Sequence, residues 1–432
     1  MPTTETAPAL DLTYIRSQFP ALAQTVNGHP AAFLDGPGGT QVPQCVIDAI
    51  AGYLRRDNAN TGGSYATSRR TDAMIAEARA AMADFLNCGA DEIVFGPNMT
   101  TLTYAMSRAI GRELEIGDEV VVTRLDHDAN VSPWLQRAGD RGATVRWAGI
   151  HDNDCTLDLA DLASKINSKT KLVAVGYASN AVGTINPVKE IVQLAHSVGA
   201  LAYIDAVHYG PHGLIDVKAL DCDFLVCSTY KFFGPHMGVL FGKSEHLQRL
   251  RPYKVRPNTN AIPNRWEWGT LNHEGIAGIA ACVEYIADIG RSARPEINSP
   301  DAGTSGVSKR RRAIEAAYEV IHEHERALLE RMMVGLEEIP GIKIYGITDP
   351  ARFPERCATL AVRIKNHTPL ELATKLGERG FFTWDGNYYA LNLTEHLDIE
   401  KSGGFLRIGL VHYNTAEEVD RLLAALHEIV GR

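Results

Sequence analysis

CSTYKFFGPHMG, residues 227–238, places a lysine at the point where an apolar segment ends. Lys231 stands between aromatic residues and is followed closely by Gly-Pro. The letters just before it, FLVCST (224–229), predict a strand that is buried on both faces. Lys231 is therefore either a solvated charge in a loop or a residue that carries chemistry at the end of a strand.

Strands and helices alternate around this stretch, from about residue 31 to residue 285. Helical patterns such as NPVKEIVQLAHSVGA, with Pro187 near its start and Gly199 at its end, separate short apolar runs. This alternation predicts an α/β fold with a large, doubly wound, mostly parallel sheet. Ligands of such sheets bind at the carboxyl ends of the strands. The expected strands are EIVFG (92–96), EVVVTRL (119–125), TVRWAG (144–149), KLVAVGY (171–177), LAYIDA (201–206), FLVCST and GVLFGK (238–243).

A polar segment, RSARPEINSPDAGTSGVSKRRR (291–312), separates this region from the rest of the chain. Its composition predicts a linker, and its basic end leaves an anion-binding patch as the alternative. A long amphipathic helix, the strand CATLAVRI and the strand FLRIGLVHY follow it. We therefore expect a large domain over 31–285 and a smaller α+β domain built from 1–30 and 286–432.

The composition limits the classes of partner. The 432 residues carry a net charge of −9, which argues against nucleic acid and against an anionic membrane surface. No apolar run approaches the roughly 18 residues of a membrane span, and MPTTETAPALDL lacks the features of a secretory signal. Seven scattered cysteines without a CxxC pair predict a reducing cytoplasm. No metal site is expected, because Pro211 interrupts the i, i+4 pair His208 and His212.

Chemically capable residues gather where the expected strands end. Asp205 ends one apolar run, and a buried carboxylate needs a partner unless it caps a helix or lies in a surface turn. Asn98, Met99 and Thr100 precede a helical stretch, whose free backbone N–H groups suit a phosphate. The other members of this set are His127, Asn180, Ser228 and Lys231.

One ligand accounts for the whole set. It needs a phosphate for the helix N-terminus, a ring nitrogen for Asp205 and a flat face for His127. It also needs a phenolate for Asn180 and an aldehyde for Lys231. Pyridoxal phosphate (PLP) has all these groups, and its sites usually pair a Schiff-base lysine with an acidic partner of the ring nitrogen.

From FLDGPGGTQ (33–41) to GLVHYNTAEEVDRL (409–422) the chain resembles the class V aminotransferases, PLP enzymes of fold type I, and among them the cysteine desulfurases. The matching pieces include DHDANVSPW, SNAVGTINP and ALDCDFLVCSTYKFFGP. The resemblance implies that Lys231 binds the aldehyde, Asp205 pairs with the ring nitrogen and His127 stacks on the ring. Asn180 and His208, which stands where the family usually has Gln, are expected near the phenolic oxygen.

The same resemblance assigns the phosphate and the substrate carboxylate. Met99, Thr100, Ser228 and Tyr230 are expected around the phosphate, with Tyr230 where many members have His. Thr270 is expected to reach the phosphate of a neighbouring subunit, which implies a homodimer with shared sites. Arg407 is either a surface ion-pair residue or a clamp on the substrate carboxylate, and a guanidinium suits the clamp.

One loop departs from the desulfurase pattern. In GFFTWDGNYYAL (380–391), Trp384 replaces the family's arginine and Tyr389 replaces the cysteine that receives sulfur. Trp384, Tyr388 and Tyr389 would suit a lid, bind substrate or, for Tyr389, supply a proton. The loop therefore leaves the reaction less defined than the cofactor.

We expect a PLP-dependent enzyme that removes the Cα proton of a small amino acid and then cleaves a Cβ–S or other β-bond, without the usual persulfide cysteine. Transamination or epimerisation is the alternative. A PLP-binding scaffold without turnover is a more distant one, since a scaffold has no need of Arg407. A sulfur acceptor protein is a possible partner.

Overall fold

The computed structural model describes residues 10–299 and 307–431. Most of the N-terminal segment that was expected not to be a secretory signal lies outside these residues, as do residues 300–306 of the expected linker. Among the described residues, no helix combines the length and the apolar character that crossing a membrane requires.

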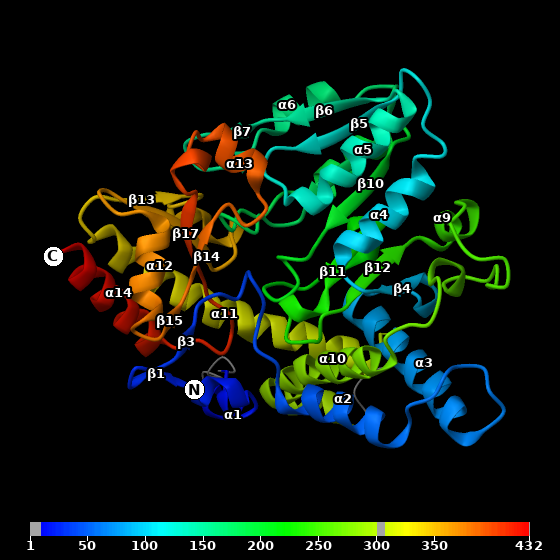
Figure 1. Cartoon of the computed structure of the whole chain (residues 1–432), viewed down its shortest axis with the longest axis horizontal. Coiled ribbons are helices and arrows are strands. Elements are labelled where there is room, and N and C mark those ends of the chain that lie inside the picture. Colours follow the sequence, from blue (N-terminus) through cyan, green and yellow to red (C-terminus); the bar gives the residue numbers. More distant parts are fainter. Residues whose placement is uncertain (1–9, 300–306, 432) are drawn as a thin grey trace, which may run out of the picture.

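A seven-stranded sheet forms the centre of the larger part of the molecule (Figure 1). Its strand order is β4-β12-β11-β10-β9-β5-β6, and only β12 runs antiparallel to its neighbours. The seven strands that the sequence predicted are these seven, which confirms the expected α/β fold. They are β4 (Ile93–Gly96), β5 (Glu119–Thr123), β6 (Thr144–Ala148), β9 (Thr170–Gly176), β10 (Leu201–Asp205), β11 (Phe224–Ser228) and β12 (Gly238–Gly242).

Helices cover both faces of this sheet, and the side chains of each strand alternate between them. On β5, Val121 packs in one core cluster while Val120 and Val122 pack in the other. The first cluster includes α3 (Ala66–Leu86), α7 (Val188–Ser197) and α10 (His273–Ala293), and the second includes α4 (Met99–Ile110) and α5 (Ser132–Arg141). Burial on both faces explains why the strands are apolar without a polar side.

A third apolar cluster lies in the C-terminal part of the chain. It joins an antiparallel sheet, ordered β13-β14-β17-β16, to α12 (Pro369–Gly377) and α14 (Ala416–Val430). The helix α11 (Lys309–Glu337) belongs to two clusters, with Ile314 and Ile321 in the first and Leu329 and Leu336 in the third. The strands are β13 (Ile342–Tyr345), β14 (Thr359–Ile364), β16 (Trp384–Gly386) and β17 (Phe405–Gly409).

Shorter elements connect these parts. The N-terminal strand β3 (Ala32–Phe33) pairs with β15 (Phe381–Phe382), so the start of the chain lies beside its C-terminal part. The remaining elements are α1 (Leu12–Ser17), α2 (Gln44–Arg56), α6 (Leu159–Lys165), α8 (Val217–Leu220), α9 (Ser244–Arg249), α13 (Leu391–His396), β1 (Thr25–Val26), β2 (His29–Pro30), β7 (Ile150–His151) and β8 (Thr156–Leu157).

The expected linker is partly helical, which corrects the sequence prediction. The helix α10 continues to Ala293 and α11 already begins at Lys309. Basic residues at its end form ion pairs, since Arg310 contacts Glu77, Asp84 and Glu284. The Ser308 side chain caps the first turn of α11 by accepting the Arg311 N–H, and Arg310 already has carboxylate partners on α3 and α10.

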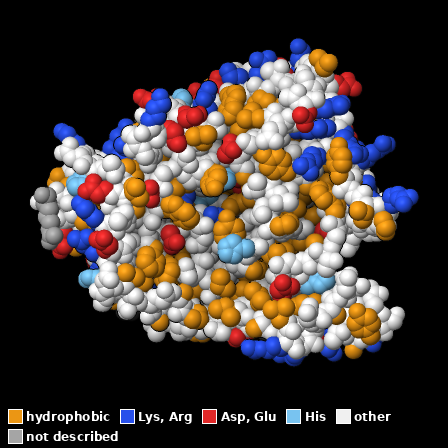
Figure 2. Space-filling model, in the orientation of Figure 1, with side chains coloured by type: hydrophobic (Ala, Val, Ile, Leu, Met, Phe, Trp, Pro, Cys, Tyr) orange, Lys and Arg blue, Asp and Glu red, His pale blue; other side chains and the backbone are white. Residues whose placement is uncertain are grey.

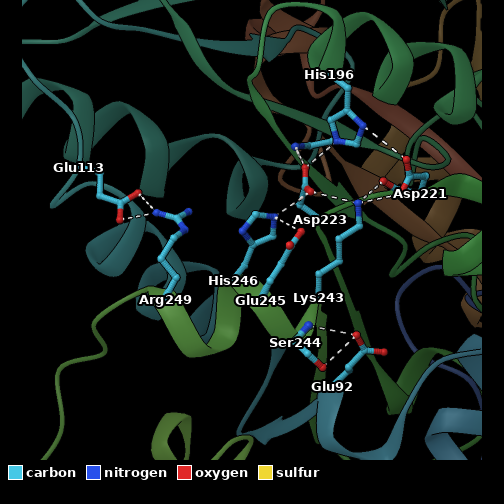
Figure 3. A network of polar contacts seen from close by, with 11 residues as sticks. Glu92, Glu113, His196, Asp221, Asp223, Lys243, Ser244, Glu245, His246 and Arg249 are labelled. Carbon is cyan, nitrogen blue, oxygen red and sulfur yellow. Dashed lines mark hydrogen bonds and ion pairs between the residues drawn. The ribbon is translucent and has the colours of Figure 1, made fainter.

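Asp223 holds together the amino-terminal edge of the central sheet, just before β11 (Figure 3). Its carboxylate contacts His196 at 2.9 Å, His246 at 3.0 Å and Lys243 at 3.3 Å, and it accepts the Ala202 N–H at 2.7 Å. Although burial opposes the effect, these donors hold the pKa of Asp223 well below its ordinary value. The buried carboxylate at this edge of the sheet thus has hydrogen-bond and ion-pair partners within the protein.

Candidate active site

A cavity of about 670 Å³ lies at the opposite, carboxyl-terminal edge of the sheet. The face shown in Figure 2 is hollowed near its centre, between this edge and the elements around β17. The structure brings the predicted site residues together here, from segments far apart in the sequence. The cavity is lined by Met99, Thr100, His127, Asn180, Asp205, His208, Ser228, Tyr230, Lys231, Trp384, Tyr389 and Arg407.

Thr270 is the one predicted site residue that does not line this cavity. It is exposed, in the segment between the short helix that ends at Trp266 and α10. Its expected reach into a neighbouring subunit stays a prediction.

Lys231 lies in a single turn of 3-10 helix directly after β11. Its ammonium group donates to the carbonyl oxygens of Pro37 at 2.5 Å and Gly38 at 2.9 Å, and no carboxylate of the described residues lies within ion-pair distance. Burial, with a further contribution from the charge of Arg407, lowers the pKa of Lys231 to about 7. A lower pKa enlarges the neutral fraction of the lysine near neutral pH, and the neutral amine is the form that acts as a nucleophile or base.

Asp205 is the last residue of β10 and is buried at the floor of the cavity. Its carboxylate accepts the Val207 N–H at 2.9 Å, and no cation within the described part of the chain forms an ion pair with it. Burial raises its pKa to about 6. A carboxylate placed like this lacks a cationic partner, and a protonated ring nitrogen would supply one.

His127 follows β5 and stacks against Tyr389 of the aromatic loop, residues 380–391. Its Nδ1 accepts the Ala129 N–H at 3.0 Å, and its ring lies 5.4 Å from that of Tyr389 at an angle of 23°. Burial, together with the charges of Lys231 and Arg407, lowers the pKa of His127 to about 4. The neutral, flat ring that results suits stacking more than proton transfer near neutral pH.

The N-terminus of α4, where a phosphate is expected to bind, lines the cavity. Its first-turn N–H groups have no helical carbonyl to bind; the Ser228 hydroxyl accepts that of Met99 at 3.1 Å and Asn98 caps that of Thr101 at 2.8 Å. Gly238 allows β12 to approach closely, because a Cβ there would lie 2.4 Å from the Asn98 carbonyl carbon. The N-terminus of α4 is therefore positioned by a backbone contact with β12 as well as by the Ser228 hydroxyl group.

Tyr230 and Asn180 also line the cavity. The Tyr230 ring stacks on His236 at 4.8 Å, with the Lys231 ammonium 4.8 Å from its centre. Asn180 donates to the Tyr388 carbonyl at 2.8 Å, while its Oδ1 is buried without a partner in the described structure. His208 also has a buried nitrogen, Nε2, without a partner there. A ligand with polar groups in the cavity would satisfy the Asn180 oxygen.

Arg407 lies on β17 and is fully buried beside the cavity. It donates to the Asn180 carbonyl at 2.8 Å and stacks over the Tyr388 ring at 4.0 Å. Its Nε has no partner and no carboxylate of the described chain pairs with it, so the surface ion pair considered for it is wrong. The buried Arg79, by contrast, binds both oxygens of Glu267. Burial lowers the pKa of Arg407 to about 10, which leaves it charged and in need of an anion.

The aromatic loop does not behave as one lid. Tyr388 is only 9% exposed, and its hydroxyl lies within hydrogen-bond distance of the carbonyl oxygens of Trp384 and Phe405, so its assignment to a lid is wrong. Tyr389 is 72% exposed and Trp384 is 50% exposed at the rim. Both tyrosines have positive φ angles, of 55° and 62°, a conformation that stores backbone strain in residues other than glycine. Strain in two successive loop residues is typical of functional sites.

Several cavity residues escaped the sequence prediction. Pro37 and Gly38 cross the cavity from the N-terminal segment, and a Cβ on Gly38 would lie 2.5 Å from the Trp384 ring. The DGPGG turn was a signal for such a close approach. Asp35, the first residue of this turn, is half-buried, and its partial burial raises its pKa to about 6. Asp126, adjacent to His127, accepts the Gly176 N–H at 2.6 Å beneath the cavity.

Cysteines are absent from the lining of this cavity as the described residues form it. Cys357 precedes β14 and Cys227 lies within β11; both are buried, and burial raises the pKa of each thiol. A thiol of this kind is a poor nucleophile. At Tyr389, where the family's cysteine was expected, the side chain is a phenol.

The residues that line the cavity match the chemical groups of PLP. Asp205 lacks a cation, Arg407 lacks an anion, and the N-terminal turn of α4 lines the cavity through Met99 and Thr100. Lys231 is close enough to neutrality to bind an aldehyde. Each unmet requirement corresponds to one group of the cofactor or of an amino-acid substrate.

Comparison with known proteins agrees with this fit. The chain matches the family described as Aminotransferase class-V over residues 32–299 and 302–422. A cysteine desulfurase of Serratia proteamaculans is 32% identical over 431 residues, covering 96% of this chain and 97% of that protein. The aminotransferase-like protein FGM3 of Gibberella zeae is 31% identical over 426 residues, covering 96% and 98%.

Solved structures give the same result. The apo cysteine desulfurase of Thermococcus onnurineus NA1 superposes with a TM-score of 0.82 at 25% identity, covering 96% of this chain and 98% of that one. The cysteine desulfurase CsdA of Escherichia coli, in an S-sulfonic acid form, gives 0.81 at 25% identity, covering 98% and 100%. The chain therefore belongs to the class V aminotransferase family, and it is a PLP-dependent enzyme of the cysteine desulfurase-like group.

Proposed function

We propose that the enzyme cleaves a β-bond of a small amino acid, such as L-cysteine or another β-substituted alanine, whose α-carboxylate binds Arg407. The observation that carries the proposal is the buried Arg407 guanidinium, which has a free Nε and no carboxylate partner within the described chain. A two-oxygen anion fits the fork of a guanidinium. The size of the cavity, about 670 Å³ for cofactor and substrate together, favours a small substrate.

Lys231 is the proposed base that removes the Cα proton. Its lowered pKa of about 7 supports this role, because an efficient base has a pKa near the working pH. Asp205 is proposed to hold the ring nitrogen of PLP in its protonated form, and His127 to stack on the ring. PLP, when bound, supplies an electron sink for the pair left on Cα.

The β-bond breaks next in this proposal. The Cα–H electron pair becomes the second bond between Cα and Cβ, and the β-substituent leaves with the electrons of its bond to Cβ. Water then converts the three-carbon product to pyruvate and ammonia. For L-cysteine the leaving group is sulfide, released directly, since no cysteine of the described residues lines the cavity. The relatives named cysteine desulfurase support Cβ–S cleavage over transamination or epimerisation.

The quaternary and cellular setting belongs to the same proposal. We propose a homodimer in which Thr270 of one subunit reaches the phosphate site of the other, and its exposure supports this. The division into 31–285 and the flanking parts stays a prediction, supported by the separate third cluster. A cytoplasmic location and a sulfur acceptor protein also stay predictions, and direct release of sulfide does not need the latter.

A substrate panel tests the reaction. The purified enzyme is incubated with L-cysteine, other β-substituted alanines, and unsubstituted amino acids with and without a 2-oxo acid. We expect pyruvate and the β-substituent in equal amounts, and Lys231→Ala to lower the rate by at least about 10³-fold. Alanine formed with persulfide on the protein, a new amino acid from the 2-oxo acid, or a racemised substrate would each replace the proposal by desulfuration, transamination or epimerisation.

Arg407→Lys tests the carboxylate site. A lysine keeps the charge but loses the fork, so we expect kcat/KM to fall about 10- to 100-fold, mainly through a higher KM. Arg79→Lys is the matched control, because Arg79 is equally buried but already bound to Glu267. An unchanged KM in Arg407→Lys would contradict the assignment.

A further inference from the structure

Three potential metal ligands meet behind the wall of the active site. His208, His212 and Cys357 are all buried, and their ligating atoms lie within 4.8 Å of one another. Pro211 was expected to keep His208 and His212 from sharing one face of a helix. Residues 207–212 form turns instead, and these turns bring the two imidazole rings to 5.1 Å. Cys357 comes from a distant part of the chain.

The two histidines have buried nitrogens without partners. Nε2 of His208 and Nε2 of His212 make no hydrogen bond within the described residues. His196 and His246, at the other edge of the sheet, each use Nε2 to reach Asp223. A buried polar atom without a partner is costly, and it marks a place where a ligand would be stabilised.

Glu325 of α11 orients one of these rings. Its Oε2 lies 2.6 Å from His212 Nδ1, so the natural arrangement is for Nδ1–H to donate to the carboxylate. That tautomer leaves a lone pair on Nε2. A carboxylate behind the second nitrogen is the usual support of a histidine that binds a metal.

We propose that His208 Nε2, His212 Nε2 and Cys357 Sγ bind a Zn²⁺ ion. Imidazole with thiolate is a ligand set that zinc prefers, and a tetrahedral site places such atoms about 3.3–3.6 Å apart. Side-chain movements of about 1 Å from the present arrangement reach that spacing. The assignment goes beyond the proposed function and does not depend on it.

A second cavity gives the ion a route and a fourth ligand. This cavity, of about 520 Å³, is lined by His212, Glu325 and Cys357, whereas His208 lines the active-site cavity. Zinc would thus lie between the two cavities, with its fourth position open to water on the side of the second. His208 would connect the ion to the active site.

The local charges permit this ion. On binding, the Cys357 thiol loses its proton to solvent, and the thiolate and the Glu325 carboxylate balance the 2+ charge. Arg356 is the nearby cation, and its guanidinium is bound to backbone carbonyls, those of Val182 at 3.2 Å and Thr359 at 2.6 Å among them. Arg356 is therefore not an ion-pair partner of the Cys357 thiolate.

Cobalt substitution tests the site on the full-length enzyme with its cofactor bound. Co²⁺ is added to chelator-treated protein, with Zn²⁺-loaded protein as the blank so that absorption by PLP cancels. We expect one Co²⁺ per chain, the intense visible bands of tetrahedral cobalt and a thiolate-to-cobalt charge-transfer band. Wild-type protein that binds no Co²⁺, or binds it without the thiolate band, overturns the proposal, and this result requires no variant to fold.

Variants then assign the ligands. Cys357→Ser should lose the charge-transfer band, and Glu325→Gln should weaken Co²⁺ binding about 10- to 100-fold while keeping the band. Cys155→Ser is the matched control, since Cys155 is another buried cysteine near Arg356. A charge-transfer band that survives in Cys357→Ser, or disappears in Cys155→Ser, overturns the assignment.

Discussion

Asp223 and Asp205 are buried carboxylates at opposite ends of the neighbouring strands β10 and β11, and the groups around them differ completely. Asp223, before β11, is held by His196, His246 and Lys243. Asp205, at the end of β10, has the Val207 N–H and no ion pair among the described residues. The pKa of the first is lowered and that of the second is raised to about 6.

Lys243 and Lys231, one at each of these two edges, differ in the same way. Although partial burial opposes it, hydrogen bonding to Asp221 raises the pKa of Lys243, whereas burial lowers that of Lys231 to about 7. One edge of the sheet satisfies its charges and so contributes to stability. The other leaves them unsatisfied until cofactor and substrate arrive, which costs stability but prepares a site.

Among the changes that test this comparison of the two edges, Asp205→Asn should have the largest effect. We expect kcat/KM to fall by about 10²–10³-fold, because the ring nitrogen loses its ionic partner. The cofactor-free variant should be at least as stable as the wild type, since a carboxylate whose pKa is raised on folding destabilises the folded state at neutral pH. Enzyme kinetics and thermal unfolding check both parts, and a variant that is clearly less stable would break the comparison.

Asp223→Asn is the reciprocal experiment. We expect a loss of about 3 kcal/mol in the free energy of unfolding, with kcat and KM unchanged. Because folding lowers the pKa of Asp223, its contribution is present above the unfolded-state pKa of about 4 and is lost as the pH falls below it. The stability difference between wild type and variant should therefore shrink in acid, and a constant difference would count against the ionic network.

Lys231 allows the comparison to be sharpened without a mutation. Only a neutral amine binds an aldehyde, so the rate of PLP uptake by the cofactor-free enzyme should rise about tenfold per pH unit and level off above about pH 7. Stopped-flow absorbance across this range measures it. A rate that continues to rise toward pH 10.5, the ordinary value of a lysine, would show that burial does not lower the pKa of Lys231.

Tyr389→Phe should have the smallest effect. The phenyl ring keeps the contact with His127, so we expect kcat to change by less than about threefold. A fall of about 10² or more would assign the proton transfer to Tyr389. Tyr389→Ala, which removes the ring as well, separates stacking from the hydroxyl group.

The sequence predicted the sheet and its carboxyl-terminal edge well, because strands buried on both faces leave continuous apolar runs that end at polar residues. Asp205 and Lys231 were identifiable for that reason. Contacts between residues far apart in the sequence were not identifiable. Pro37, for example, contacts Lys231 across nearly 200 positions. His212 and Cys357 likewise meet only in the folded chain. The burial of Tyr388 depends on a left-handed backbone that no side-chain pattern indicates.

The helix α11 has a consequence for how the molecule unfolds. Its first half packs in a core that contains the central sheet, and its second half packs in the C-terminal core. Melting either half removes side chains from a core and frees the end of the helix that enters the other. The two cores should therefore lose structure together, and amide hydrogens along α11 should exchange through one shared opening event.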